Sequence, residues 1–266
     1  MRRLWLAGGV ALMGCQGVSP LTNKIAVGEE PLVIMVGTGV DNQIDLFAGS
    51  PGGGVAHRLT FTRNVEFSPA IHPGGAAVAF LRRATASADS TTWLSVMNLV
   101  NAAEREAVVP AGIGRPQRVG WSPDGTRLYV SGEYGFAASA APPAAMELTA
   151  LEPGHAEIAA ADSATAILLG SPPIARVEAC SGSCIATAAQ AMCVVAPTGE
   201  RQELGTQVRW PTRWGADSLG YFDGERVMVR PLAGGPARVV AFTRMPKEAG
   251  MLAYWSREGE RERGRE

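Results

Sequence analysis

The sequence predicts an all-β protein: a single β-propeller of about five or six four-stranded blades, its ring closed by N- and C-terminal strands. Three observations support this prediction. A strand–turn–strand hairpin recurs along the chain, and its copies lie about 45 residues apart. The 32 Gly and 18 Pro are spread through all 266 residues, and helix-forming heptads are absent. Short strands joined by tight turns are therefore expected throughout.

The hairpin is clearest in two segments, residues 69–80 and 120–130. Each has a bulky residue, a small polar one, a turn that ends in Gly, and then alternating apolar residues. The turn of the second copy reads Trp121-Ser122-Pro123-Asp124-Gly125. In the first copy Pro73 and Gly75 take the Pro and Gly places. Pro presets φ, Asp accepts local N–H bonds and Gly adopts positive φ, so these residues fix the register of the hairpin.

Weaker copies follow at residues 178–186, 214–222 and 255–259, the last opening on Trp255. The turn positions are taken as Gly75, Gly125, Gly182, Ser218 and Gly259, at intervals of 50, 57, 36 and 41 residues. Further strands are expected at 93–99, 192–195 and 227–230. A noisy period of about 45 is typical of a four-stranded propeller blade.

The repeat resembles that of a known family. The residues that carry the resemblance are the complete turn, Arg58-Leu59-Thr60, and Asp45-Leu46-Phe47 ahead of a Gly-rich turn. They are similar to the propeller repeat of the TolB family, also seen in prolyl-oligopeptidase-like enzymes. The resemblance covers most of the mature chain and implies a propeller in the periplasm or at the cell envelope that serves as a binding platform. The TolB propeller has six blades, whereas five copies are found here, two of them degraded.

The two ends of the predicted propeller complement each other. Residues 32–36 and 43–47 supply later strands of a blade that has no opening hairpin, and residues 251–259 supply an opening strand with only charge after it. We therefore expect one shared blade that closes the ring and removes exposed sheet edges.

The first residues predict where in the cell the protein is located. Arg2 and Arg3 precede an apolar run, residues 4–13, and the run ends in Leu12-Met13-Gly14-Cys15. Such a run is too short to span a bilayer, which needs roughly 20 residues. A Cys directly after Leu-x-Gly is typical of bacterial lipoproteins, so Cys15 is the predicted lipid attachment site. The alternatives are a conventional signal peptide or a chance cysteine.

These features divide the chain into four parts. The predicted domains are a lipoprotein signal peptide at 1–14, a tether at 15–30, the β-propeller at 31–256 and a disordered charged tail at 257–266. The tail has no apolar residue to bury. A docking tail for a partner is the alternative interpretation. The protein is expected to be exported and lipid-anchored, facing the periplasm or the cell surface.

The other cysteines suit an oxidising compartment. Cys180 and Cys184 flank a Ser-Gly-Ser turn and are the candidate disulfide pair, although Cys193 leaves two other pairings open. No metal is expected, because His57, His72 and His155 show no ligand spacing. Asp41, Gln43 and Asp45 match only the start of a calcium loop.

Composition and sequence motifs reduce the number of function classes that fit the chain. With 24 Lys and Arg against 25 Asp and Glu, the chain offers no basic stripe for nucleic acid. No nucleophile elbow, zinc-protease motif or phosphate-binding loop is present, so neither an enzyme nor a cofactor is predicted. The prediction is a monomeric binding scaffold for an envelope protein or peptide. The alternative is an envelope hydrolase or lyase with a metal in the propeller channel.

Two connections are the candidate partner-facing loops, residues 136–145 and 210–214. In the second, Trp210, Arg213 and Trp214 are the candidate binding residues. The competing interpretation is that both tryptophans only pack between blades.

Overall fold

A computed structural model describes the chain in several ranges. They are residues 18–84, 91–122, 124–139, 147–150, 176–179, 192–195, 199, 201–205, 207–215 and 217–257, with the backbone alone at 176–179 and 194.

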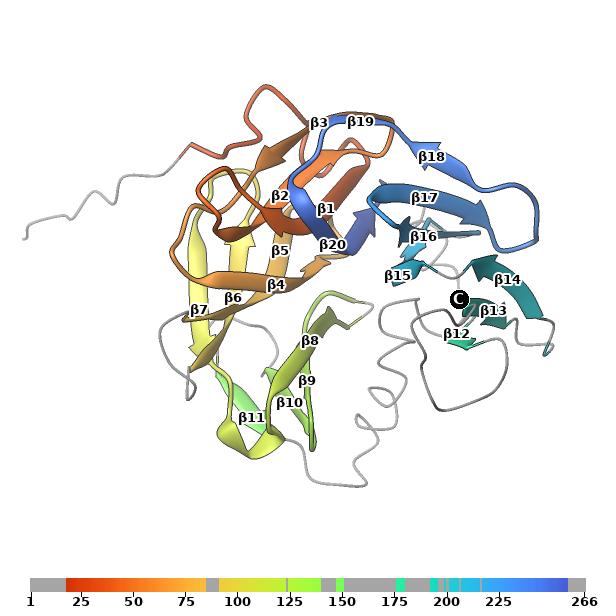
Figure 1. Ribbon diagram of the computed structural model, residues 1–266. Coiled ribbons are helices and arrows are strands. Elements are labelled where there is room, and N and C mark those ends of the chain that lie inside the picture. The colour runs from red at the N-terminus through yellow and green to blue at the C-terminus, as the bar shows by residue number, and fades with distance from the viewer. Residues whose placement is uncertain are drawn as a thin grey trace, which may run out of the picture.

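Five β-sheets make up the described part of the chain (Figure 1), and each is named here after its lowest-numbered strand. The β1 sheet has the order β20 (Lys247–Trp255), β1 (Leu32–Thr38), β2 (Ile44–Ser50), β3 (Gly53–Arg58) and β19 (Phe242–Arg244). The β4 sheet comprises β4 (Val65–Ile71), β5 (Ala77–Arg83), β6 (Thr92–Asn98) and β7 (Glu104–Val108). The β8 sheet comprises β8 (Pro116–Trp121), β9 (Leu128–Gly132), β10 (Phe136–Ser139) and β11 (Leu148–Ala150).

The remaining two sheets come from the second half of the chain. The β12 sheet comprises β12 (Arg176–Ala179), β13 (Met192–Val195) and β14 (Arg201–Gly205). The β15 sheet comprises β15 (Val208–Trp214), β16 (Ser218–Asp223), β17 (Arg226–Pro231) and β18 (Arg238–Val240). A single 3-10 turn, η1 (Ala111–Ile113), stands between β7 and β8. The all-β prediction is thus confirmed, as are the strands expected near 93, 192 and 227.

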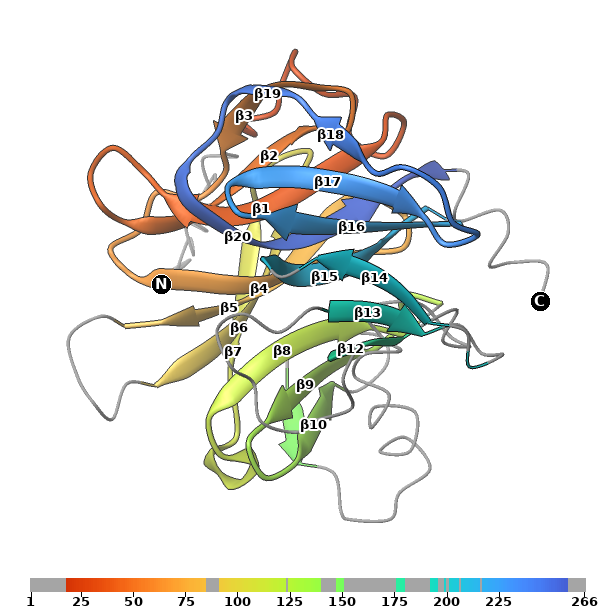
Figure 2. The same ribbon diagram turned by 45° about the vertical axis from the view of Figure 1, so that its right-hand side comes forward.

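The sheets are arranged as propeller blades (Figure 2). One edge strand of each of four sheets lies at the centre: β15 lies beside β20, β20 beside β4, and β4 beside β8. The other strands of each sheet follow outward, and each is antiparallel to its neighbour except β19, which is parallel to β3. The β4, β8 and β15 sheets have four strands each, the β1 sheet has five, and three strands of the β12 sheet are described.

The blades pack face to face through apolar side chains. On β1, Ile34 joins the cluster shared with the β4 sheet, whereas Val33 and Met35 join the cluster shared with the β15 sheet. Because successive side chains of a strand point to opposite faces, a strand covered on both faces is apolar at every position. This explains why residues 32–36 read as one unbroken apolar run, with no polar alternation.

The repeat turns fold as the sequence predicts. The N–H of His72 donates to the carbonyl of Ala77 at 2.8 Å, and the N–H of Ser122 donates to that of Arg127 at 2.9 Å. Gly75 and Gly125 have φ of 70° and 71°, the left-handed conformation expected for the turn glycine. Pro123 and Gly259 lie outside the described residues.

Each turn also carries a contact to the neighbouring blade. The indole N–H of Trp255 donates to the carbonyl of Pro73, and a Cβ on Gly75 would stand 2.5 Å from the Trp255 ring. Likewise the indole of Trp121 donates to the carbonyl of Ala70 at 3.0 Å, with His72 edge-on to its ring at 4.7 Å. The repeated Trp is therefore a residue that joins blades.

The Asp124 carboxyl makes the stability contributed by this turn depend on pH. Hydrogen bonds from the Ser122 hydroxyl and from the N–H and hydroxyl of Thr126 lower the pKa of its carboxyl to about 2. A lowered folded-state pKa contributes stability above the unfolded pKa, and that stability is lost as pH falls through the folded one. We expect Asp124→Ala to melt below the wild type at about pH 6 and to match it near pH 2. Thermal melts across this range test this, and a gap independent of pH would contradict it.

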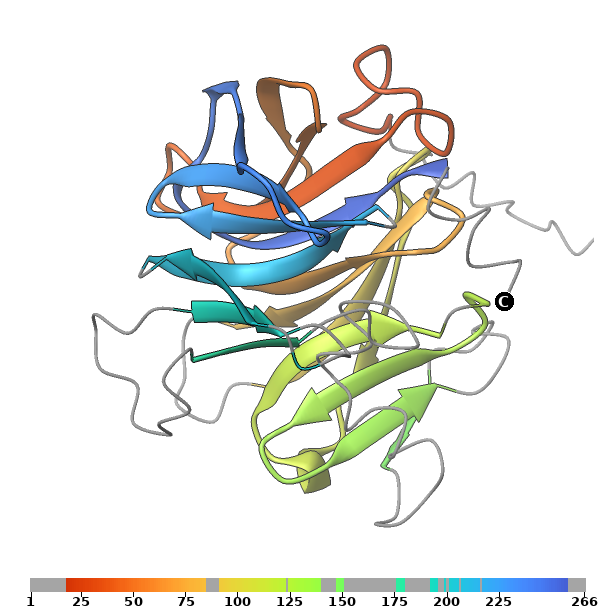
Figure 3. The same cartoon turned by 90° about the vertical axis from the view of Figure 1, so that its right-hand side faces the viewer.

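The shared sheet at the chain ends is confirmed (Figure 3). β20 pairs antiparallel with β1, from Leu32 opposite Trp255 to Thr38 opposite Lys247. β20 begins earlier than the expected 251. A fifth strand in this sheet was not expected: β19 adds to its outer edge, parallel to β3, with the N–H of Gly54 donating to the carbonyl of Ala241 at 3.0 Å.

Three details of the sequence prediction are wrong. Ser218 is the first residue of β16, and Gly215, with φ of 74°, is the turn glycine of that hairpin. Residues 136–139 are strand β10, which pairs with β9, so the first candidate loop begins as part of a blade. Residues 210–214 belong to β15, because Pro is tolerated in a strand at an edge or a bulge, and β15 provides both.

Candidate functional site

The four central strands meet around a pocket on the propeller axis. Its lining comes in pairs, one from each strand: Ser68 and Pro69 from β4, Gln117 and Arg118 from β8, Trp210 and Pro211 from β15, and Met251 and Leu252 from β20. The pocket has a volume of about 30 Å³. It reaches the surface where Gln117 is exposed and Trp210 is 38% exposed. We name it the axial pocket.

A bulge shapes the wall of this pocket in each blade. The register of pairing shifts between Phe67 and Ala70 in β4 and between Arg209 and Thr212 in β15. A bulge leaves a residue out of the ladder and turns its side chain in a new direction. Here the bulges fall at Ser68 and Pro69 and at Trp210 and Pro211, and all four residues line the axial pocket.

The backbone at the bulges is strained. Ser68, Trp210 and Met251 all have left-handed φ, at 53°, 52° and 46°. Such a conformation costs a non-glycine residue about 1–3 kcal/mol and concentrates at functional sites. Three blades of the propeller carry this strain at the same place, which marks the axial pocket as the candidate functional site.

Hydrogen bonds hold the strands of the pocket together. The N–H of Ser68 donates to the Met251 sulfur at 3.1 Å, and the N–H of Val119 donates to the Ser68 hydroxyl oxygen at 3.0 Å. A Cβ at Gly250 would stand 3.0 Å from the Trp210 indole nitrogen, so the two strands approach closely there. The pocket is thus defined by contacts among four blades.

Arg118 is the one charged residue among the described residues that line the axial pocket. It is half-buried, and burial lowers the pKa of its guanidinium. No hydrogen bond or ion pair joins this guanidinium to any described residue. The side chain therefore brings a positive charge into the pocket with no compensating anion from the described chain.

The structure separates the three predicted binding residues. Trp210 lines the axial pocket. Arg213 donates from Nε to the carbonyl of Gly215 at 2.7 Å. Trp214 is 5% exposed and stacks on Tyr254 with ring centroids 4.5 Å apart, so it packs between blades, as the competing interpretation proposed.

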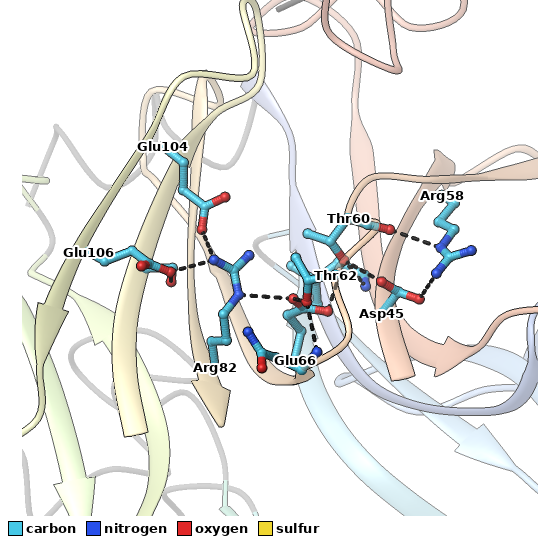
Figure 4. A network of polar contacts seen from close by, with 11 residues as sticks. Asp45, Arg58, Thr60, Thr62, Glu66, Arg82, Glu104 and Glu106 are labelled. Atoms are coloured by element: carbon cyan, nitrogen blue, oxygen red, sulfur yellow. Dashed lines mark hydrogen bonds and ion pairs between the residues drawn. The ribbon is translucent and has the colours of Figure 1, made fainter. Parts of the chain in front are cut away.

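A second polar cluster lies between the β1 and β4 sheets (Figure 4). Arg58 forms an ion pair with Asp45 at 2.5 Å, and the Thr60 hydroxyl bonds to both Asp45 and Glu66, at 3.2 and 3.1 Å. Glu66 is paired with Arg82 at 3.0 Å. Asp45 and Glu66 are fully buried, so this cluster, here called the interblade network, joins the two blades through charges that depend on one another.

Arg82 is the most connected residue of the interblade network. It also pairs with Glu104 at 2.5 Å and with Glu106. Burial raises the pKa of the Asp45 and Glu66 carboxyls, more than their arginine partners lower it. Burial pulls the pKa of Arg82 down, but the hydrogen bond and charge of Glu104, with the charge of Glu66, outweigh it and raise the pKa.

The partial calcium pattern belongs to this network. Asp41 and Asp45 both form ion pairs with Arg58, at 3.0 and 2.5 Å. Within the described ranges no group of three or more His, Cys, Asp or Glu side chains is placed to hold a metal ion. The described carboxylates of the pattern are therefore held by a guanidinium.

The cysteine predictions lie mostly beyond the described chain. Cys15, Cys180 and Cys184 are all outside it. Cys193, on β13, is buried and disulfide-bonded, with its partner outside the described residues. The described part also has no helix that is both long and apolar enough to cross a membrane.

Radial sheets around an axial pocket define a β-propeller. Comparison with solved structures finds several similar chains. The chain is similar to TolB from Acinetobacter baumannii, with 11% identity, a TM-score of 0.42, and coverage of 86% of this chain and 62% of that one. It is similar to a TolB-type protein from Agrobacterium tumefaciens, with 12% identity, a TM-score of 0.32, and coverage of 85% and 99%.

A peptidase is among the similar structures too. The acylaminoacyl peptidase of Pyrococcus horikoshii has 10% identity and a TM-score of 0.32, with coverage of 76% of this chain and 36% of the peptidase. The chain thus spans less than two thirds of the Acinetobacter TolB and of this peptidase. No family model and no curated protein matches the sequence.

Sequence reasoning missed most of the axial pocket, although a signal for it exists. In three blades the lining residues stand three and four positions before the repeated Trp. They are Gln117 and Arg118 before Trp121, Trp210 and Pro211 before Trp214, and Met251 and Leu252 before Trp255. Once the Trp is aligned among repeats, this spacing identifies the lining.

Proposed function

We propose that this protein is a non-catalytic, membrane-tethered β-propeller of the bacterial cell envelope that binds a protein or peptide partner at its axial pocket. The observation that carries the proposal is the lining of the pocket, where Trp210 is partly exposed and Arg118 has no ionic partner among the described residues. Trp and Arg are enriched among residues that dominate binding energy at protein interfaces. A rigid ring that positions them suits a recognition surface.

The ring in this proposal has five blades. The described clusters join the β12 sheet to the β15 sheet through Leu204, and the β15, β1, β4 and β8 sheets in that order. A fifth junction, between the β8 and β12 sheets, would complete the ring.

The proposed location is supported by the leader and by cysteine chemistry. Cys15 stands where a lipoprotein carries its diacylglycerol, and each buried methylene of an acyl chain contributes about 0.8 kcal/mol to membrane affinity. A disulfide at Cys193 is favoured in an oxidising compartment such as the periplasm. Together they support an exported, lipid-anchored protein.

The anchor is tested by metabolic labelling. In cells that express the full chain and are fed a palmitate analogue, we expect the wild type to take up the label and Cys15→Ala to lose it completely, because Cys15 supplies the thiol that is acylated. Cys193→Ala is the matched control and should label like the wild type. Labelling of Cys15→Ala would refute the anchor.

The partner site is tested by affinity purification from crosslinked envelopes. We expect Trp210→Ala to lose about 90% or more of the recovered partner, since a central aromatic anchor contributes 2 kcal/mol or more. Tyr134→Ala is the control, because Tyr134 is an exposed aromatic residue outside the axial pocket. Equal recovery with wild type and Trp210→Ala would remove the axial pocket from the binding site.

A further inference from the structure

The charge of Arg118 requires explanation. A guanidinium taken partly out of water without an anion lowers stability, and buried arginines are ordinarily paired. Arg58 and Arg82 follow this rule, because each has a carboxylate partner at 3.0 Å or less. Arg118 has no carboxylate partner among the described residues, and it lines a pocket.

Ser68 offers a second donor to the same pocket. Its oxygen accepts from the N–H of Val119 at 3.0 Å, and no hydrogen bond donated by its hydroxyl is found within the described residues. The residue itself is buried and lies in the pocket lining, held there by its left-handed backbone. The strained bulge therefore places a hydroxyl donor in the wall of the pocket that Arg118 also lines.

The size and the walls of the axial pocket restrict the ligand. A cavity needs about 10–15 Å³ to hold one water, so about 30 Å³ accepts a group the size of a carboxylate. Pro69, Pro211, Met251 and Leu252 make the remaining wall largely apolar. One guanidinium balances a single negative charge, whereas a phosphate dianion would keep an uncompensated charge beside apolar side chains.

We propose that the axial pocket is a carboxylate site, in which the Arg118 guanidinium and the Ser68 hydroxyl hold a carboxylate of an acidic peptide segment while Trp210 covers the apolar group next to it. Planar guanidinium and carboxylate groups match in a bidentate arrangement. This inference rests on the proposed binding function and names the chemistry that the partner presents.

The test uses the full-length chain and two small probes, butyrate and its uncharged counterpart butyramide. The side-chain Nε–H resonance of Arg118 is followed by NMR and is assigned by its loss in Arg118→Gln. We expect butyrate to shift this resonance saturably and butyramide to leave it in place. Equal effects of the two probes, or no saturable shift with butyrate, would overturn the inference.

Variants locate the site. Butyrate affinity measured by calorimetry should fall about tenfold or more in Arg118→Gln, the loss expected for a charged hydrogen bond, and less in Ser68→Ala. Arg118→Lys keeps the charge but not the planar fork, so it should fall between wild type and Arg118→Gln. Arg115→Gln is the matched control, since Arg115 is exposed three positions earlier and lies outside the lining. Wild-type affinity in Arg118→Gln would contradict the assignment.

Two further measurements distinguish the possible outcomes. Inorganic phosphate that binds more tightly than butyrate would overturn the carboxylate assignment in favour of a general anion site. Arg118→Gln should melt at the same temperature as the wild type or above it, because it removes an unpaired charge, and a large drop would indicate a structural role instead. If butyrate fails while Trp210→Ala still loses the envelope partner, the inference falls and the proposed function stands.

Discussion

A chain that lacks residues 250–266 should not fold cooperatively. The deletion removes Leu252, Ala253 and Trp255, which are buried, and leaves the inner edge of β1 without its partner. Loss of a buried Leu costs about 2–5 kcal/mol and loss of a buried Trp about 3–5. The sum approaches the whole stability of a typical domain, about 5–15 kcal/mol. Near-UV circular dichroism and calorimetry should show no cooperative transition.

The matched control is a shorter truncation. A chain that lacks only residues 258–266 keeps all of β20 and should melt like the full chain. Adding a synthetic peptide of residues 247–257 to the longer truncation should restore part of the transition, because the open edge of β1 accepts an antiparallel strand. An unchanged melting temperature after removal of 250–266 would show that the shared sheet does not hold the propeller together.

Arg82→Ala should lower the free energy of unfolding by about 3–5 kcal/mol, the cost of breaking a buried ion pair by removing one partner. The reason is Glu66, which is fully buried and keeps only the hydroxyls of Thr60 and Thr62 as partners once the guanidinium has gone. Chemical denaturation at neutral pH measures the change. A loss below 1 kcal/mol would mean that the interblade network contributes little to stability.

The pH dependence of the stability of Arg82→Ala tests whether Glu66 causes the loss. Without Arg82 the pKa of Glu66 should rise further, because burial then acts with less opposition. A carboxyl with a raised folded-state pKa contributes stability that is present below the unfolded pKa and is lost as pH rises through the folded one. The deficit of the variant should therefore shrink from about pH 7 to about pH 5.

An exposed ion pair serves as the control for the buried one. Arg226 and Asp223 pair at 3.2 Å with both side chains exposed, and such pairs contribute about 0–1 kcal/mol. Arg226→Ala should therefore change stability by less than about 1 kcal/mol at every pH. If the loss of unfolding free energy in Arg82→Ala does not change with pH, as expected for Arg226→Ala, an uncompensated Glu66 is not its cause.

The sequence predicted the parts of the fold that depend on local chemistry. The turn at Asp124 and Gly125 is fixed by hydrogen bonds and backbone angles within a few residues. The shared sheet was predictable from complementary fragments at the two ends of the propeller. Ser218 was misplaced because Asp and Ser also favour turns, and nothing local distinguishes them from the glycine that takes positive φ.

The candidate site was predictable only in part. Trp210 was singled out because a Trp-rich segment is conspicuous, whereas Arg118 and Ser68 are unremarkable in sequence. Their importance arises from bulges on different blades that bring them to one axis, which is a tertiary effect. The apparent loop at 210–214 misled for a related reason, since Pro211 signals a loop unless the strand edge it occupies is known.

The pairing of residue 32 with residue 255 also sets the order of events when the chain is made. The first three strands emerge from the ribosome long before the strand that completes their sheet. Until then the edge of β1 presents free backbone groups, and such edges invite association with other chains. A topology dominated by contacts between residues so far apart in sequence folds slowly. The nascent chain should therefore depend on chaperones until β20 has been synthesised.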